Sequence, residues 1–321
     1  MKHMTVPSHE EVQIRLSDPL KLRMDWDELQ AARAHLHNPE AARILGVPEA
    51  ALVASRLGAG AIRLPADPLQ ILSPISEWRR VLVAVHNALG VSLALGQVED
   101  VAQVGDVIRL RGSHLDTSFS AASVANAFWF VEVDDNHGRT RSLQFSDAGG
   151  GDIIKVFLFH KTAAAAAERR FKALAETVAQ TAFSPAAMPD PAGLYTPDRD
   201  QPGRIELLAA SAPLAFQTAL SRMGELNAPV HIDTFALRAA QSFRGRVTHA
   251  RIDEVMAHLH EPDIRMHLRP GVLRAVQVRR LEGRIAALEF TDPSGLSLRL
   301  SSPQHAQVFS EWAQTVTETL A

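Results

Sequence analysis

Residues 141–158, RSLQFSDAGGGDIIKVFL, and residues 286–300, AALEFTDPSGLSLRL, decide the fold because they repeat one pattern. In each stretch, two segments of alternating polarity flank a short turn that contains glycine, which is typical of a β-hairpin. The matched positions are Leu143 with Leu288, Phe145 with Phe290, and Asp147 with Asp292. The two hairpins therefore indicate a duplicated unit.

The sequence around each hairpin repeats as well. An alternating segment precedes each one, FWFVEV at 128–133 and LRAVQV at 273–278. A helix-like segment follows each one, FKALAETV at 171–178 and FSEWAQTV at 309–316. Because the strands and helices are segregated along the chain, we predict an α+β fold of two structurally repeated halves. Each half is an antiparallel β-sheet with flanking helices.

The two halves are separated by a stretch with little apolar periodicity. Residues 184–203 hold five prolines, a composition that is typical of a linker. We therefore predict an N-terminal half over 20–183 and a C-terminal half over 204–321. Two like halves form a cleft between them, and ligands usually bind in clefts of this kind.

Local periodicity predicts the remaining elements. The helical segments are expected at 25–57, 67–90, 162–180, 204–223 and 252–260. Short strands are expected at 91–112 and 229–250, where the apolar period changes to two. The corner near Gly46 resembles a helix-turn-helix, but its second helix, PEAALVASRL, offers only Arg56 for DNA contacts.

Composition narrows the function classes. The net charge of −3 argues against nucleic-acid or membrane-surface binding, and no apolar run is long enough to insert into a membrane. The chain has no cysteine, which excludes thiolate metal sites and a cysteine nucleophile and is consistent with the cytoplasm. No common hydrolase, zinc-protease or nucleotide-binding motif is present.

Three segments resemble the cytoplasmic heme-utilisation proteins of Gram-negative bacteria, the hemin transport or hemin-degrading factors of HemS type. The first is AARILGVPEAALVASRLGAGAIRL at 41–64, and the second is the hairpin at 141–158. The third comprises IRMHLRPGVLRAVQVRR, which begins at Ile264, and the hairpin segment AALEFTDPSG. The resemblance covers most of residues 25–320.

The resemblance implies two repeated α+β halves with heme bound between them. It also implies that a helix at the start of the second half supplies a histidine to the iron. Basic residues would hold the propionates, and polar or aromatic groups would come from the last strands. A heme oxygenase is the partner that the resemblance implies for a trafficking protein.

This chain departs from that pattern at most of the implied heme-site positions. The helix at 204–223 contains no histidine, and the axial position falls on Pro213 or Leu214. The polar and basic positions of the last strand fall on Arg299, Ser301 and Gln304. Of the family's basic contacts, the one at Arg280 remains basic.

Other donors are spread along the second half. His231, His267 and Met223 are the alternative iron ligands. His258 and His260 form a His-x-His pair close to His249, and they could share a metal ion only if their segment were extended.

Three functions therefore remain open. The leading hypothesis is a cytoplasmic protein that binds and transports heme or another tetrapyrrole after losing the usual axial histidine. The second is a binding module for another hydrophobic anion or a protein partner. The third is a heme-degrading enzyme, which the missing proximal ligand disfavours.

Overall fold

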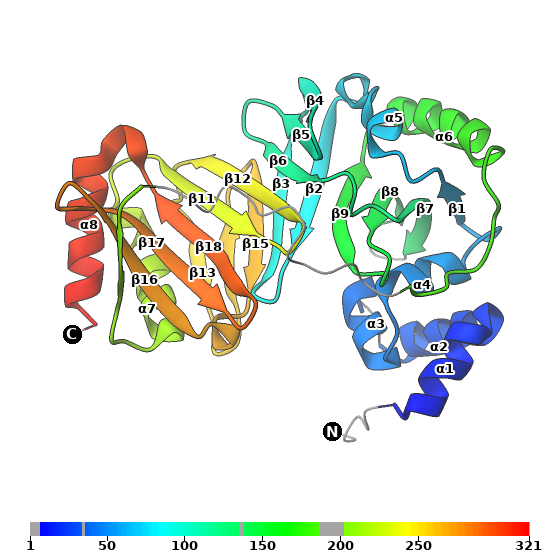
Figure 1. Cartoon of the computed structure of the whole chain (residues 1–321), viewed down its shortest axis with the longest axis horizontal. Coiled ribbons are helices and arrows are strands. Elements are labelled where there is room, and N and C mark those ends of the chain that lie inside the picture. The colour runs from blue at the N-terminus through cyan, green and yellow to red at the C-terminus, as the bar shows by residue number, and fades with distance from the viewer. Residues whose placement is uncertain (1–6, 34–35, 135–137, 187–201, 321) are drawn as a thin grey trace. The chain divides into compact units, whose positions relative to one another are not determined.

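A computed structural model describes residues 7–33, 36–134, 138–186 and 202–320 (Figure 1). The chain divides into two compact units. Unit 1 contains Met1–Trp78 and Ala121–Leu194, and unit 2 contains Arg79–Ser120 and Tyr195–Ala321. None of the helices in the described ranges has the length and hydropathy needed to cross a bilayer.

Unit 1 is a four-stranded antiparallel sheet with helices. The strands follow the order β1 (Ala61–Leu64), β7 (Asn126–Asp134), β8 (Gly138–Ser146) and β9 (Asp152–Leu158). The helices are α1 (His9–Ser17), α2 (Pro19–Ala32), α3 (Asn38–Leu45), α4 (Glu49–Ser55), α5 (Pro68–Leu72), the 3₁₀ turn η1 (Ile75–Trp78) and α6 (Lys161–Ala175).

Successive aromatic residues of β7 show how the sheet is covered. Phe130 packs against Trp26 of α2, with ring centroids 6.2 Å apart. Its neighbour Trp129 points the other way and packs against Phe171 of α6 at 5.1 Å. Because alternate side chains of a strand face opposite sides, helices cover both faces of the sheet at this strand.

Unit 2 contains two sheet segments and an apolar core between them. Strands of the first segment follow the order β2 (Arg80–His86), β3 (Gly90–Gln97), β15 (Ile264–Leu268), β14 (Ala257–His260) and β13 (Ala250–Ile252). The second, nine-stranded sheet has the order β10 (Arg204–Leu207), β16 (Ala275–Leu281), β17 (Arg284–Asp292), β18 (Gly295–Ser301), β11 (Val230–Phe235), β12 (Ala239–Gly245), β6 (Asp116–Ser120), β5 (Val107–Arg111) and β4 (Asp100–Val104). The helical elements are α7 (Ala212–Ser221), η3 (Met223–Glu225), η4 (Pro270–Val272), η5 (Pro303–His305) and α8 (Ala306–Glu318).

The duplication predicted from the two hairpins is confirmed. The order β1-β7-β8-β9 is repeated by β10-β16-β17-β18, and α6 and α8 follow the two hairpins. Even the irregularity of the hairpins is shared, since their registers shift directly after the matched residues Phe145 and Phe290. Gly150 and Gly295 both adopt positive φ, at 84° and 119°, which a side chain would disfavour.

The compact units do not coincide with the sequence halves. Strands β2 to β6 precede the linker in sequence, yet β3 pairs with β15 and β6 pairs with β12 within unit 2. The halves 20–183 and 204–321 therefore describe the duplication, and their boundaries stay a prediction. Most of the predicted linker lies outside the described residues.

Three helix predictions were wrong in part or entirely. The segment 67–90 is helical only at α5 and η1, and it continues as β2, where β-branched residues favour a strand. The segment 204–223 begins with the edge strand β10, and its helix α7 starts only after the N-cap residue Ser211.

The predicted helix at 252–260 was wrong throughout. Asp253 accepts hydrogen bonds from the backbone N–H groups of Val255 and Met256, which forms a turn in place of a first helical turn. The following residues form β14.

A buried ion pair fastens α4 to the sheet of unit 1. The ammonium Nζ of Lys155 on β9 lies 2.5 Å from Glu49 Oε1 at the start of α4, and 3.7 Å from Asp152 Oδ2. Burial of Lys155 by itself lowers its pKa, but Asp152 and Glu49 together outweigh burial and hold the pKa above its ordinary value of 10.5. The charged form is therefore the one that the fold favours.

We expect Lys155→Met to lower the free energy of unfolding by about 3 kcal/mol at neutral pH, because Glu49 would keep a buried charge without its main partner. The double variant Glu49→Gln/Lys155→Met should regain most of that loss. Since the pKa of Lys155 is raised on folding, its contribution is fully present below pH 10.5 and is lost as the pH rises through the folded value. Urea unfolding at several pH values measures both effects, and equal stability of Lys155→Met and the parent chain would contradict them.

Candidate functional site

All the site positions named from the sequence lie in unit 2, most of them on or next to its nine-stranded sheet. The register places Glu289 of β17 opposite Arg299 of β18, which in turn lies opposite Asp233 of β11. Two residues farther along β18, Ser301 lies opposite His231 of β11. Because side chains alternate along a strand, these five polar residues share one face. The other face carries the apolar core residues Leu288, Phe290, Leu298, Leu300 and Ile232.

The arginines of this polar face are engaged by one glutamate. Glu289 accepts two hydrogen bonds from Arg279, at 2.8 and 3.2 Å, and its Oε1 accepts a third from Arg299 Nε at 2.9 Å. Arg299 is only 1% exposed and lies over the Phe235 ring at 5.1 Å. The positive charge of Arg299 is therefore already paired with Glu289 within the sheet. A heme propionate would have to compete with Glu289 for this arginine.

Two titratable groups next to these arginines are shifted toward their neutral forms. Burial raises the pKa of Asp233, while a hydrogen bond from Ser242 at 2.6 Å and the charge of Arg299 oppose that shift. Burial also lowers the pKa of His231, and nearby Arg244 lowers it further. A neutral imidazole is the form that can ligate a metal.

The predicted residues Ser301 and Gln304 are brought together around His231. Ser301 is its cross-strand neighbour, and the side chain of Gln304 raises the pKa of His231 slightly, against the effect of burial. Ser301 and Arg299 lie on β18, and Gln304 follows that strand directly, so the three positions are close together, and their role toward heme stays a prediction.

Arg280 belongs to a different environment. It lies opposite Ile285, beyond the register shift in β16, on the face that carries the apolar core. Its Nε donates to Glu206 Oε2 at 2.9 Å, and about a third of each side chain is exposed. Arg280 and Arg299 therefore do not form one basic cradle.

Helix α7 offers no iron ligand at the axial position that the resemblance implies, Pro213 or Leu214. Leu214 is 53% exposed, and Pro213 forms part of the first helical turn. Met223 is only 2% exposed within the apolar core. Heme iron takes an imidazole, thiolate, thioether or phenolate ligand, which Pro213 and Leu214 lack, while the thioether of Met223 is enclosed in the core. These residues therefore do not fit the heme site that the resemblance implies.

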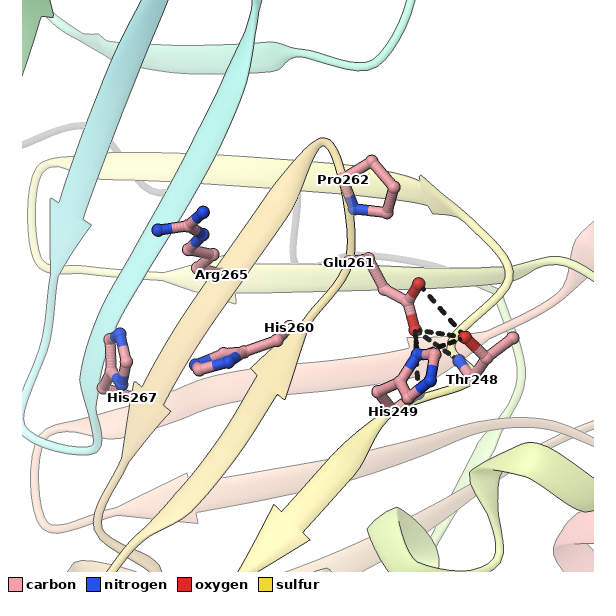
Figure 2. A pocket seen from close by; sticks show the side chains of 7 residues that line it. All are labelled: Thr248, His249, His260, Glu261, Pro262, Arg265 and His267. Atoms are coloured by element: carbon pink, nitrogen blue, oxygen red, sulfur yellow. Dashed lines mark hydrogen bonds and ion pairs between the residues drawn. The ribbon is translucent and has the colours of Figure 1, made fainter.

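A cluster of histidines on the first sheet segment was missed as a group. His267 of β15 and His258 of β14 face each other, with their Nδ1 atoms 2.8 Å apart, and His260 lies beside them. An open pocket of about 700 Å³ borders this cluster, and its lining residues are drawn in Figure 2. The His-x-His pattern of β14 was the available signal, but the predicted helix separated the two side chains.

Comparisons with known proteins agree with this fold. The family model described as the haemin-degrading HemS.ChuX domain matches residues 46–177. The hemin transport protein HmuS of Yersinia pestis is 30% identical over 122 residues, which is 38% of this chain and 35% of that protein. The hemin transport protein HemS of Yersinia enterocolitica is 28% identical over 139 residues, or 41% of this chain and 40% of that protein. The chain therefore matches well under half of the length of these relatives.

Solved structures are similar over a greater length. The apo form of PhuS, a heme-binding protein from Pseudomonas aeruginosa, has a TM-score of 0.75 and 20% identity, over 95% of this chain and 99% of that one. The heme degrading enzyme ChuS of Escherichia coli O157:H7 has a TM-score of 0.77 and 16% identity, over 94% and 99%. At these identities the likeness concerns the fold. The comparisons therefore show a haemin-degrading HemS.ChuX domain over residues 46–177 and, over nearly the whole chain, a fold like that of PhuS and ChuS.

Proposed function

We propose that this protein binds heme or a related tetrapyrrole as a carrier in heme-iron utilisation, without an iron ligand from α7. The match of residues 46–177 to the HemS.ChuX domain carries the proposal. The hemin transport proteins of Yersinia and the fold shared with PhuS support it. As a carrier of this family, the protein would act in the cytoplasm and pass its ligand to a heme oxygenase.

The residues of α7 define how such binding would differ from the family pattern. An exposed leucine at the axial position offers apolar contact to a macrocycle but no electron pair to iron. Binding would therefore depend on burial of the macrocycle and on its carboxylates, both of which a porphyrin without iron also has. Heme degradation is not part of the proposal, because it needs a proximal ligand that neither Pro213 nor Leu214 supplies.

The second candidate is a binding module for another hydrophobic anion or a protein partner. The ion pairs of Arg279 and Arg299 with Glu289 favour this second candidate, because they leave less positive charge to bind the propionates of a heme. The two candidates differ in whether any tetrapyrrole binds at micromolar concentration.

We expect hemin and iron-free protoporphyrin IX to bind the full chain with affinities within about tenfold of each other, because iron coordination by α7 contributes nothing. Absorbance titration in the Soret region measures the first, and fluorescence titration measures the second. If neither porphyrin bound, the carrier function would be rejected in favour of the second candidate. A hemin affinity far above that of protoporphyrin would locate an iron ligand outside α7.

Of the two arginines at the implied heme-site positions, Arg280 is the one whose side chain is accessible to a ligand carboxylate, since about a third of it is exposed. We expect Arg280→Ala to weaken hemin binding by roughly 1–3 kcal/mol, which is the usual contribution of a hydrogen bond to a charged group. Arg204→Ala is the matched control, since Arg204 pairs with Arg280 across the strands and its Nε lies 3.7 Å from the same Glu206. Equal losses in the two variants, or no loss in Arg280→Ala, would reject the propionate role of Arg280.

A further inference from the structure

Three imidazoles converge on one face of the first sheet segment of unit 2. His258 and His260 are two residues apart in the extended strand β14, so they share a face. Antiparallel pairing with β15 places His267 directly opposite His258. The ring centroids are 5.1 Å apart for His258 and His267, 5.4 Å for His260 and His267, and 6.0 Å for His258 and His260. The rings are inclined to one another by 69–75°, so they surround a common point without stacking.

The spacing of the donor atoms is close to that of a three-histidine metal site. One ring nitrogen from each residue lies within 4.8 Å of the other two. An ion bound at its usual distance of about 2.0–2.1 Å would place tetrahedral nitrogen ligands roughly 3.3 Å apart. The Nδ1 atoms of His258 and His267, now 2.8 Å apart, would separate slightly, and the exposed His260 would rotate inward.

The second ring nitrogen of His258 is oriented by a carboxylate. His258 Nε2 lies 3.5 Å from Asp253 Oδ2. Asp253 is itself held by the backbone N–H groups of Val255 and Met256, at 3.0 and 2.7 Å from its Oδ1. A carboxylate behind a histidine is the common outer partner in metal sites, where it fixes the tautomer and orients the ring. Because Asp253 lies beside Nε2, the nitrogen of His258 that can bind a metal ion is Nδ1, which faces His267.

The cluster opens onto the pocket of Figure 2, where the His260 and His267 rings lie side by side. At the other end of the pocket His249 bonds to Thr248 at 2.7 Å and lies beside Glu261, so it is not part of the group. Arg265 and Glu261 also line this pocket. The positive charge of Arg265 disfavours the binding of a cation there, whereas the negative charge of Glu261 favours it. A bound ion would keep an open position toward solvent.

We propose that His258, His260 and His267 form a binding site for a divalent transition metal ion of borderline softness, represented by Zn²⁺. Imidazole nitrogens suit this class of ion, while Ca²⁺ and Mg²⁺ require oxygen ligands. With three protein ligands, the fourth position belongs to water or to a small exogenous ligand. The site is separate from the tetrapyrrole function proposed above and does not depend on it.

Zn²⁺ titration of the heme-free full chain, followed by calorimetry, tests the site. We expect one ion per chain with a dissociation constant of about 10 µM or lower. His260→Gln and His267→Gln should each weaken binding by roughly tenfold or more, whereas His249→Gln, the matched control in the same pocket, should not. His260 is exposed, so its variant keeps the fold, and circular dichroism checks both.

Two further readouts separate this site from heme binding. Bound Co²⁺ should show the visible absorption of a nitrogen-ligated ion of low coordination number. Hemin affinity should be the same in His260→Gln and the parent chain. The site is rejected if no saturable Zn²⁺ binding occurs up to about 100 µM, or if both variants bind Zn²⁺ like His249→Gln. A parallel loss of hemin affinity would reassign the histidines to the heme iron.

Discussion

Glu289 lies between two buried arginines, and the chemistry of the polar face of unit 2 depends on this one residue. It accepts hydrogen bonds from Arg279 and Arg299 at distances of 2.8–3.2 Å, and all three residues are less than 10% exposed. Buried charges persist only when they are paired, so the carboxylate stabilises two cations that the sheet would otherwise exclude. The same pairing reduces the charge that these arginines can offer to an anionic ligand.

The part of the chain that matches the HemS.ChuX domain and the part in which the resemblance places the ligand are different. The HemS.ChuX match covers residues 46–177, whereas the implied heme-site positions lie between Pro213 and Gln304. The fold has been kept over the whole length, as the likeness to PhuS and ChuS indicates. At the positions that the resemblance implies, α7 carries a proline and a leucine, and Arg299 is paired with Glu289 within the sheet.

Much of the fold could be predicted because its signals are local. The two hairpins, the α3–α4 corner at Gly46 and the strands at 91–111 follow from alternation, turn residues and caps within short windows. Errors arose where strand pairing decides the structure. The segment 252–260 has apolar residues at helical spacing, yet pairing with its neighbours and the turn at Asp253 make it extended. Edge strand β10 has only four residues, too few to show a period.

The candidate site was also hard to predict where it depends on contacts between residues that are distant in the sequence. The sequence identified Arg280, Arg299, Ser301 and Gln304, but it could not show that Glu206 and Glu289 engage the two arginines, because those partners are separated in the chain. It noted the His-x-His pair, but His267 joins that pair only through the β14–β15 register.

The central proposal is that this protein binds a tetrapyrrole without an iron ligand from α7. Restoring that ligand with Leu214→His, at a position that is already exposed, tests it most directly. We predict that hemin affinity rises by about tenfold or more with the spectrum of histidine-ligated iron, while the affinity for protoporphyrin IX stays the same. An unchanged hemin spectrum and affinity in that variant would contradict the account.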